Sequence, residues 1–217
     1  MFFKSKLNPE KIKKANTKKL NKQGLKVIDH LPILDEPSFR SDEAVAKRSL
    51  AMMGIIQLMF EAPNDFIREW LTDNDLIDEL TEHEKHLLDT SFDKLNQQQQ
   101  IDLHWTIECL WAFTWMASKH SELTLNTSIE DTLAAMFPSI ADNESVEVFI
   151  KEYKLRPEAE IFSMLDYFYR AHWVARNNNL NGIKDDKVNL SIIMERRRAL
   201  EWVCDSSIDW DDISLDT

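Results

Sequence analysis

Two ionisable side chains stand out in the segment IDLHWTIECLWAFTWM, residues 101–116, because their neighbours in sequence are apolar. At about 100° per residue the segment is apolar on all sides, and His104 and Glu108 lie one turn apart beside Trp111 and Trp115. A helix without a polar face is typical of the centre of a core. We therefore expect His104 and Glu108 to be largely buried.

A second group of charged residues lies in residues 161–176. His172 and Arg176 share a side with apolar residues, and Asp166 and Arg170 form an i, i+4 pair on another side.

The last expected helix, residues 188–203, shows the same mixture. Glu195 lies in the middle of its apolar stripe and Arg196 at the edge, whereas Arg197 and Arg198 are expected to turn toward solvent.

Buried charges cost several kcal/mol per ion unless they are paired. We therefore expect a polar centre that joins the three long helices, with members His104, Glu108, Arg170, His172, Arg176, Glu195 and Arg196. One interpretation is a structural cluster of ion pairs that fixes helix register, and the other is the floor of a ligand pocket. If the cluster is structural, replacing Glu195 by Ala should leave a buried cation unpaired and cost on the order of 3 kcal/mol or more, whereas an active-site role alone would leave the melting temperature unchanged.

Specific catalytic signatures are missing from the chain. Three scattered glycines cannot form a phosphate-binding loop, and no Glu is followed three residues later by His, as di-iron bundles require. The cluster Glu82-His83-Glu84-Lys85-His86 is interpreted as a solvated helix surface that follows a capping box at Thr81. We expect no catalytic residue, metal or cofactor; Glu108 with Glu195 as general acid and base is the best enzyme hypothesis.

The elements that position these residues are almost entirely helices. Scarce glycine and hydrophobic repeats of helical period predict an all-α, single compact multi-helix domain. Residues 25–37, apolar and interrupted by proline, are expected to form an extended strap. The expected helices cover residues 9–23, 41–60, a short stretch through Trp70, a stretch from Thr81, 101–116, 128–138, 144–153, 157–178 and 188–204.

Charge is distributed unevenly along the chain. The formal net charge is -12, but residues 1–24 hold eight lysines and one glutamate, about +7, so the remainder carries about -19. We expect a basic N-terminal arm or helix over residues 1–24 and one helical domain over residues 25–217. The acidic body disfavours nucleic acid as a partner and suits a basic protein.

The chain ends in CDSSIDWDDISLDT, where five aspartates surround one tryptophan. Apolar residues between the charges favour a tail that docks on the body over a free acidic tail. Trp210 is the expected apolar anchor, and Asp209, Asp211 and Asp212 are expected to meet Arg or Lys side chains.

Two isolated cysteines, Cys109 and Cys204, indicate reduced thiols instead of a disulfide framework or zinc site. We see no signal peptide and no run of the roughly 18 apolar residues that a membrane span needs. A cytoplasmic protein without membrane contact is expected.

Several stretches of the chain together resemble the bacterial family catalogued as domain of unknown function DUF4272. The resemblance is carried by LPIL with Arg40, EAVAKRSL, EWL, HWTIECLWAFTWM, LRPEAEI, YRAHWVAR and ERRRALEWVCDSSIDWDDISLDT, in that order from about residue 9 to Thr217. It implies one intact domain and a family pattern at Arg40, Arg48, Glu108, Arg156, Arg170, Trp173, Glu195, Arg196, Trp202, Trp210 and Asp211. The resemblance implies no established activity. The lysine-rich start of the chain departs from the family pattern, so any role of the basic arm would be particular to this protein.

Three classes of function remain open at this point. The first is a non-catalytic binding or regulatory protein, of adaptor or immunity type, which the acidic surface and the missing motifs favour. The second is an enzyme or small-ligand binder that uses the polar centre, with Glu108 and Glu195 as its carboxylates. The third is weak nucleic-acid binding through the basic arm.

Overall fold

The computed structural model describes residues 7–217, and within that range the chain is all-helical and forms one compact domain, as predicted. No strand occurs there, and none of its helices combines the length and the apolar character that crossing a membrane requires. The α-helices are α1 (Pro9–Lys22), α2 (Asp42–Ile56), α3 (Asn64–Asp73), α4 (Glu82–Leu87), α5 (Gln97–Met116), α6 (Val146–Glu152), α7 (Glu158–Leu180) and α8 (Leu190–Cys204).

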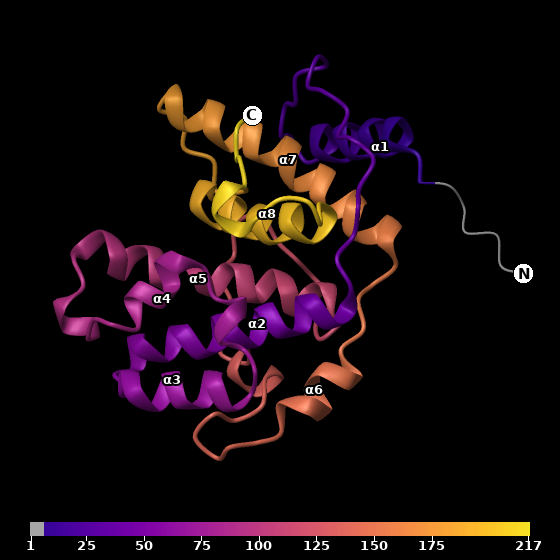
Figure 1. The fold of residues 1–217 in the computed structure, drawn as a ribbon. Helices are drawn as coiled ribbons and strands as arrows, with labels where there is room; N and C mark the ends of the chain where they lie inside the picture. Colours follow the sequence, from indigo (N-terminus) through magenta and orange to yellow (C-terminus); the bar gives the residue numbers. More distant parts are fainter. Residues whose placement is uncertain (1–6) are drawn as a thin grey trace, which may run out of the picture.

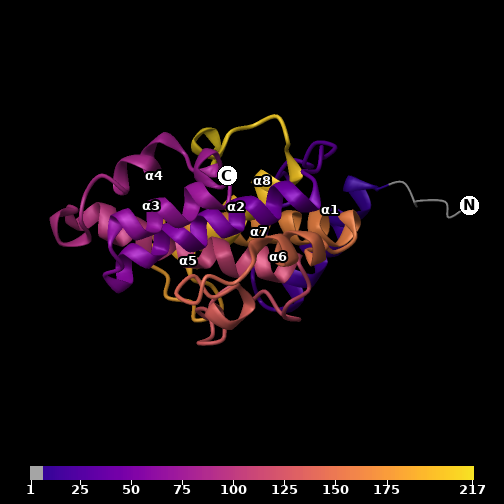
Figure 2. The ribbon, with the colours of Figure 1, turned by 60° about the horizontal axis from the view of Figure 1, so that its bottom comes forward.

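The long helices pack as a stack. α8 packs along both α7 and α5, and α5 packs against α2 (Figure 1). α1 covers α7, while α3 and α6 lie against α2. In the turned view the short helix α4 and the basic helix α1 again lie toward opposite ends of the molecule (Figure 2).

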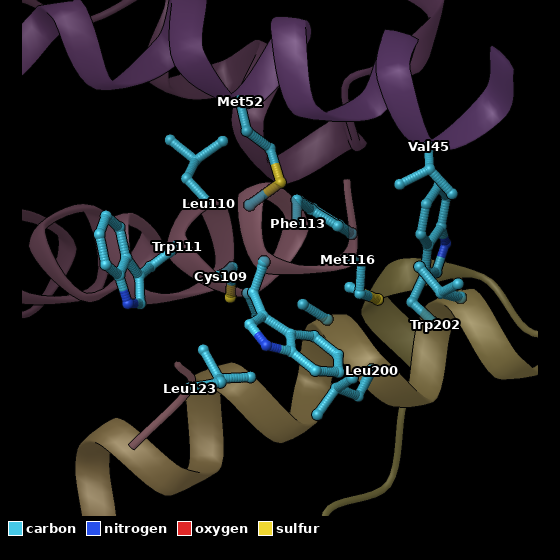
Figure 3. Close-up of a cluster of buried hydrophobic side chains, with 14 of the residues drawn as sticks. Val45, Met52, Cys109, Leu110, Trp111, Phe113, Met116, Leu123, Leu200 and Trp202 are labelled. Atoms are coloured by element: carbon cyan, nitrogen blue, oxygen red, sulfur yellow. The ribbon is translucent and has the colours of Figure 1, made fainter. Parts of the chain in front are cut away.

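The centre of the stack is a continuous hydrophobic core. Figure 3 shows Met52 of α2, Phe113 and Met116 of α5, and Leu200 and Trp202 of α8 converging there. From Glu108 to Met116 every side chain of α5 is buried, so this half of the helix is the central element that the apolar pattern predicted.

Helix ends follow local sequence signals. The capping box predicted at Thr81 is present, with the Glu84 side chain accepting the Thr81 backbone N–H, and a second box pairs Asn96 with Gln99. Gly24, with φ +84°, supplies the left-handed residue after α1. Gly54 lies where a Cβ atom would come within 3.0 Å of Leu71, so glycine permits the close approach of α2 and α3.

The strap and the tail run beside each other outside the helices. Residues 25–40 contain no helix, and within this segment the side chains of Leu25, Val27 and Leu31 are buried. The Ser38 backbone N–H donates to the carbonyl of Cys204 at 2.9 Å, which joins the strap to the start of the tail. The N-terminal strap thus helps to hold the last segment of the chain.

The helix expected over residues 128–138 is wrong. Only a 3-10 turn, Ala134–Met136, forms there. An eleven-residue helix is marginal without a packed apolar face. The chain just before it is held in a loop instead, because the carbonyls of Thr124 and Thr127 accept hydrogen bonds from Arg196.

Candidate functional site

The expected members of the polar centre do not form one network. The structure distributes them over separate ion pairs along α5, α7 and α8, each with its own partners. The geometry of each pair decides whether it can act on a ligand.

Glu108 and Arg196 form a buried ion pair between α5 and α8. Arg196 is fully buried and its Nε and Nη2 atoms lie 2.9 and 2.7 Å from Glu108 Oε2. Its other donors reach the carbonyls of Thr124 and Thr127 at 2.7 and 2.8 Å and the Thr124 hydroxyl at 3.2 Å. These contacts match the five N–H groups of a guanidinium. The pair therefore fixes α5, α8 and the loop at residues 124–127, with no donor left for a ligand.

Arg170 belongs to a different cluster, at the junction of α7 with α1 and the strap. Its Nη2 lies 2.5 Å from Asp166 Oδ1, and it also donates to the Pro32 carbonyl at 3.2 Å. Asn16 of α1 donates to Asp166 Oδ2 at 2.9 Å. The i, i+4 pair that the sequence indicated is thus the anchor that holds α1 and the strap on α7.

His172 contacts Arg197, which is buried at 3% exposure and not turned toward solvent as expected. Arg197 Nη1 lies 2.8 Å from His172 Nδ1 and also donates to the carbonyls of Leu215 and Asp216. A guanidinium can only donate, so Nδ1 must accept and the imidazole is neutral. Burial, and then the charges of Arg197 and Arg176, lower the pKa of His172 to about 4. This pair holds the last residues of the tail.

Glu195 lies at the edge of the core and pairs with Arg198 at 3.2 Å. The Cys109 thiol donates to the Glu195 carboxylate at 3.4 Å and to its carbonyl at 3.2 Å. Burial raises the pKa of Glu195, against the opposing effect of Arg198, and burial followed by the charge of Glu195 raises that of Cys109. Glu108 and Glu195 each have a separate arginine and share no proton or ligand contact.

Two predicted members of the polar centre lie outside the interior. His104 is exposed because the first turns of α5 are uncovered; Ile101, one turn earlier, has 41% of its surface exposed. Arg176 is also exposed, and its ion-pair contact within residues 7–217 is with Asp216, at 4.0 Å. Within residues 7–217 no group of three or more His, Cys, Asp or Glu side chains is placed to hold a metal ion.

One buried cluster was missed by the sequence analysis. Arg48 of α2, 2% exposed, binds both carboxylate oxygens of Glu84 at 2.6 and 2.8 Å and the Glu79 carbonyl at 2.7 Å. Its guanidinium lies 4.5 Å from the ring centre of Trp210. Glu84 is therefore buried and does not belong to a solvated surface. A signal was present, since Arg48 lies two residues before the apolar run of residues 50–56 in the same helix.

The C-terminal tail packs on the body through Trp210. Its ring lies 5.9 Å from that of Trp202 and 6.0 Å from that of Phe113. Arg40 stacks on Trp202 at 4.2 Å and donates to the carbonyls of Trp202 and Ile208. Aromatic packing and arginine–carbonyl bonds thus hold the tail.

Burial lowers the pKa of Arg40 and the charge of Asp209 opposes this shift, so Asp209 contributes to this docking through its charge, but the tail aspartates form no ion pair there within the described chain. Asp209, Asp211 and Asp212 are exposed, and within residues 7–217 none of them forms the ion pair with Arg or Lys that we expected. Arg40 and Arg48, the nearest arginines, are already bonded to carbonyls and to Glu84. The negative charges therefore remain available at the surface.

Two adjoining hollows lie on either side of Trp210, and together they are called the Trp210 groove. Their volumes are about 260 and 560 Å³, and both are lined by Thr81, Trp210 and Asp211. The larger hollow also has Arg40, Arg48, Asp78, Glu79, Leu80, Glu82, Lys85, Trp202, Asp209 and Asp212 on its walls, and the smaller reaches Ile55, His83, Glu84, Leu87, Asp102, Leu103, Thr106, Glu195 and Arg198.

The Trp210 groove carries an excess of unpaired carboxylates. Asp78, Glu79 and the three tail aspartates form no ion pair within residues 7–217, whereas Lys85 is taken by Glu82. Burial raises the pKa of Glu79 although Lys47 and Arg48 oppose the shift. A cationic group entering the groove would relieve this desolvation and the mutual repulsion of the carboxylates.

Comparison with known proteins identifies the family. The family model described as Domain of unknown function (DUF4272) matches residues 12–213 of the 217-residue chain. No curated protein and no solved structure matches the chain.

Proposed function

The chain belongs to the DUF4272 family, and because that family's description carries no activity, we propose a function from the geometry. The protein is a non-catalytic binding protein that captures a basic protein partner in the Trp210 groove. An adaptor or an immunity-type inhibitor would work in this way.

The observation that carries the proposal is the set of five unpaired carboxylates around Trp210. These residues line the same groove as Trp210, whose ring already lies beside the guanidinium of Arg48, and a further guanidinium or ammonium group would be attracted by their carboxylates. Arginine, which pairs with carboxylates in bidentate geometry and stacks on aromatics, fits this environment best.

The state of the buried charges supports a binding role over catalysis. Glu108 and Asp166 are each bonded to a buried arginine and lie 4% and 1% exposed. A general acid or base needs access to its substrate. Both carboxylates are closed off from a substrate by burial and by their arginine partners.

The overall charge favours the same kind of partner. A chain of net charge -12 attracts a basic protein over distance and increases the rate of encounter at low salt. We also propose a cytoplasmic location, supported by two buried free thiols at Cys109 and Cys204.

Titration calorimetry with a capped arginine-rich peptide tests the proposal. We expect saturable, salt-sensitive binding to the full chain. The triple variant Asp209→Asn/Asp211→Asn/Asp212→Asn should bind at least about tenfold more weakly, the equivalent of one charge-assisted contact.

A matched control separates the groove from general charge. Asp93→Asn/Glu147→Gln/Glu152→Gln removes the same charge from exposed positions outside the groove. The proposal requires this control to bind the peptide like the unmodified protein. If both triple variants weaken binding equally, the attraction is non-specific and the proposal is contradicted.

A second candidate function has one observation in its favour. The smaller hollow of the groove reaches Glu195, whose pKa is raised by burial, so a small cationic ligand could bind there beside Trp210. Titrating methylguanidine while recording the indole N–H signal of Trp210 by NMR tests this. Saturation that is lost in Glu195→Gln but kept in Glu108→Gln would support the small-ligand function, whereas an unchanged spectrum would contradict it.

A further inference from the structure

The outer face of α1 has the opposite chemistry to the Trp210 groove. Asn16 and Leu20 are buried against α7 and fix the rotation of the helix, and the Asn16 amide donates to Asp166 and to the Ser163 carbonyl. At about 100° per residue, this anchoring directs Lys14 and Lys18 away from the body. The orientation of the lysine-rich face is therefore set by buried contacts.

A hollow of about 760 Å³ lies along this face, lined by residues of α1 and by Asp29 of the segment that follows it. Lys14, Lys18 and Lys22 follow one another at i, i+4 spacing along its length, over about 12 Å. Thr17 and Asn21 lie between them, and Asp29 is the one acidic residue of the lining. Three ammonium groups and two neutral polar side chains thus face one elongated hollow.

The donors of this hollow are unused. Within residues 7–217 neither Lys14, Lys18 nor Lys22 has an ion-pair or hydrogen-bond partner, and the Thr17 hydroxyl is buried without one. Asn21 accepts the Val27 backbone N–H with its Oδ1 at 3.0 Å, which leaves its amide nitrogen free to donate.

Lys13, which also lines the hollow, differs from these lysines because its ammonium group has a partner. Its Nζ donates to the Leu31 carbonyl, so this lysine serves to hold the strap beside α1. The strap in turn forms the second wall of the hollow through Asp29. Of the four lysines in the lining, Lys13 holds the strap, and Lys14, Lys18 and Lys22 remain available for a ligand.

We propose that this hollow, the α1 hollow, binds a compact ligand that carries more than one phosphate group. A terminal phosphate offers about two negative charges and three acceptor oxygens, which suits ammonium groups supplemented by a side-chain amide. Three lysines at successive turns match phosphates joined in a short chain or clustered on one molecule.

The charge of the rest of the protein limits the size of the ligand. Residues 25–217 carry about -19, so a long nucleic acid strand that left the α1 hollow would run along a repelling surface. A ligand that fits within about 12 Å of helix avoids this repulsion. The same phosphate chemistry occurs on soluble polyphosphates and on phosphorylated lipid headgroups.

Titration calorimetry with inorganic tripolyphosphate on the full chain tests the inference. We expect saturable binding that weakens by at least about tenfold in Lys14→Gln/Lys18→Gln and not in the matched variant Lys94→Gln/Lys151→Gln, whose lysines are exposed elsewhere. Citrate, which carries similar charge on carboxylates, should bind at least about tenfold more weakly than tripolyphosphate.

Two further titrations distinguish the sources of the phosphate. Binding to phosphoinositide vesicles but not to phosphatidylserine vesicles, with the same lysine dependence, would assign a lipid headgroup; binding to tripolyphosphate alone would assign a soluble ligand. The inference is overturned if tripolyphosphate does not bind saturably, if citrate binds equally well, if both lysine variants behave alike, or if only a single-stranded oligonucleotide binds.

Discussion

The interior of the helix stack and the Trp210 groove contain the same kinds of charged residue in opposite states. Inside, Glu108 is held by Arg196 at 2.7 Å and Asp166 by Arg170 at 2.5 Å, and both arginines are fully buried. In the groove, Asp211 and its neighbours have no ion-pair partner within residues 7–217. The difference shows that burial, not residue type, separates charges that stabilise the fold from charges that remain available.

Glu195 lies between these two regions and clarifies the comparison. Its side chain is 15% exposed and that of its partner Arg198 is 35% exposed. Removing one partner would therefore leave the other in contact with water and not in an apolar interior. The cost of about 3 kcal/mol expected from the sequence for Glu195→Ala is therefore too high, and the large effect belongs to Glu108.

The largest predicted effect is that of Glu108→Ala. Removing this carboxylate leaves Arg196 buried and unpaired, and the free energy of unfolding should fall by about 3–5 kcal/mol. Urea unfolding measures it, with Glu195→Ala as the comparison at about 1 kcal/mol. Equal losses in the two variants would remove the distinction between interior and edge.

Trp210→Ala should have the next largest effect. The ring is partly buried against Trp202 and Phe113 and covers the guanidinium of Arg48. A loss of about 2 kcal/mol is expected, below the 3–5 of a fully buried tryptophan. The control Leu180→Ala, at a residue 77% exposed, should change stability by less than about 0.5 kcal/mol in the same urea titrations. No loss in Trp210→Ala would mean that the tail is not held by its anchor.

Acid should loosen the end of the tail through His172. Its folded pKa of about 4 lies below the ordinary value of 6.5, so the unfolded chain binds more protons between these limits. The contribution of His172 to stability is therefore complete above pH 6.5 and is lost as the pH falls toward 4. Protonation also places a cation against Arg197, which holds the Leu215 and Asp216 carbonyls.

Unfolding measured at several pH values tests this dependence. His172→Gln should flatten the fall in stability between pH 6.5 and 4, whereas His104→Gln, at an exposed position, should not. Identical profiles for the two variants would show that another group governs the response to acid.

The smallest effect on stability is expected from Asp209→Asn/Asp211→Asn/Asp212→Asn. Since these carboxylates form no ion pair within the described chain, their loss should change the free energy of unfolding by less than about 0.5 kcal/mol, although a basic peptide should bind at least about tenfold more weakly. Thermal melts beside the calorimetric titrations measure both. A substantial destabilisation would instead make the tail aspartates part of the fold.

Local patterns were sufficient for most of the fold. The helical period, the Thr81 capping box, and Gly24 after α1 each act over a few residues, so the all-α class, most helix positions and the anchoring role of Trp210 could be predicted. The errors arose where a distant residue intervened. Arg196 donates hydrogen bonds to the carbonyls of Thr124 and Thr127 and holds this segment in a loop. No local sequence pattern near residue 128 indicates this contact.

The candidate site was less predictable for the same reason. A helical wheel says which side chains share a face but not how far a neighbouring helix extends over it, so His104 was expected inside and Arg197 outside. The pair of Arg48 with Glu84 joins residues 36 positions apart, and the pair of Glu108 with Arg196 joins residues 88 apart.

By itself, the amino-acid sequence determined the helices, the uneven charge and the presence of ionisable groups on apolar faces, because each of these depends on composition or on neighbours along the chain. Only the tertiary structure decided which charges neutralise one another and which are left unpaired. The physical reason is that an ion pair depends on distance and on exclusion of water, and both are set by how α2, α5, α7 and α8 stack.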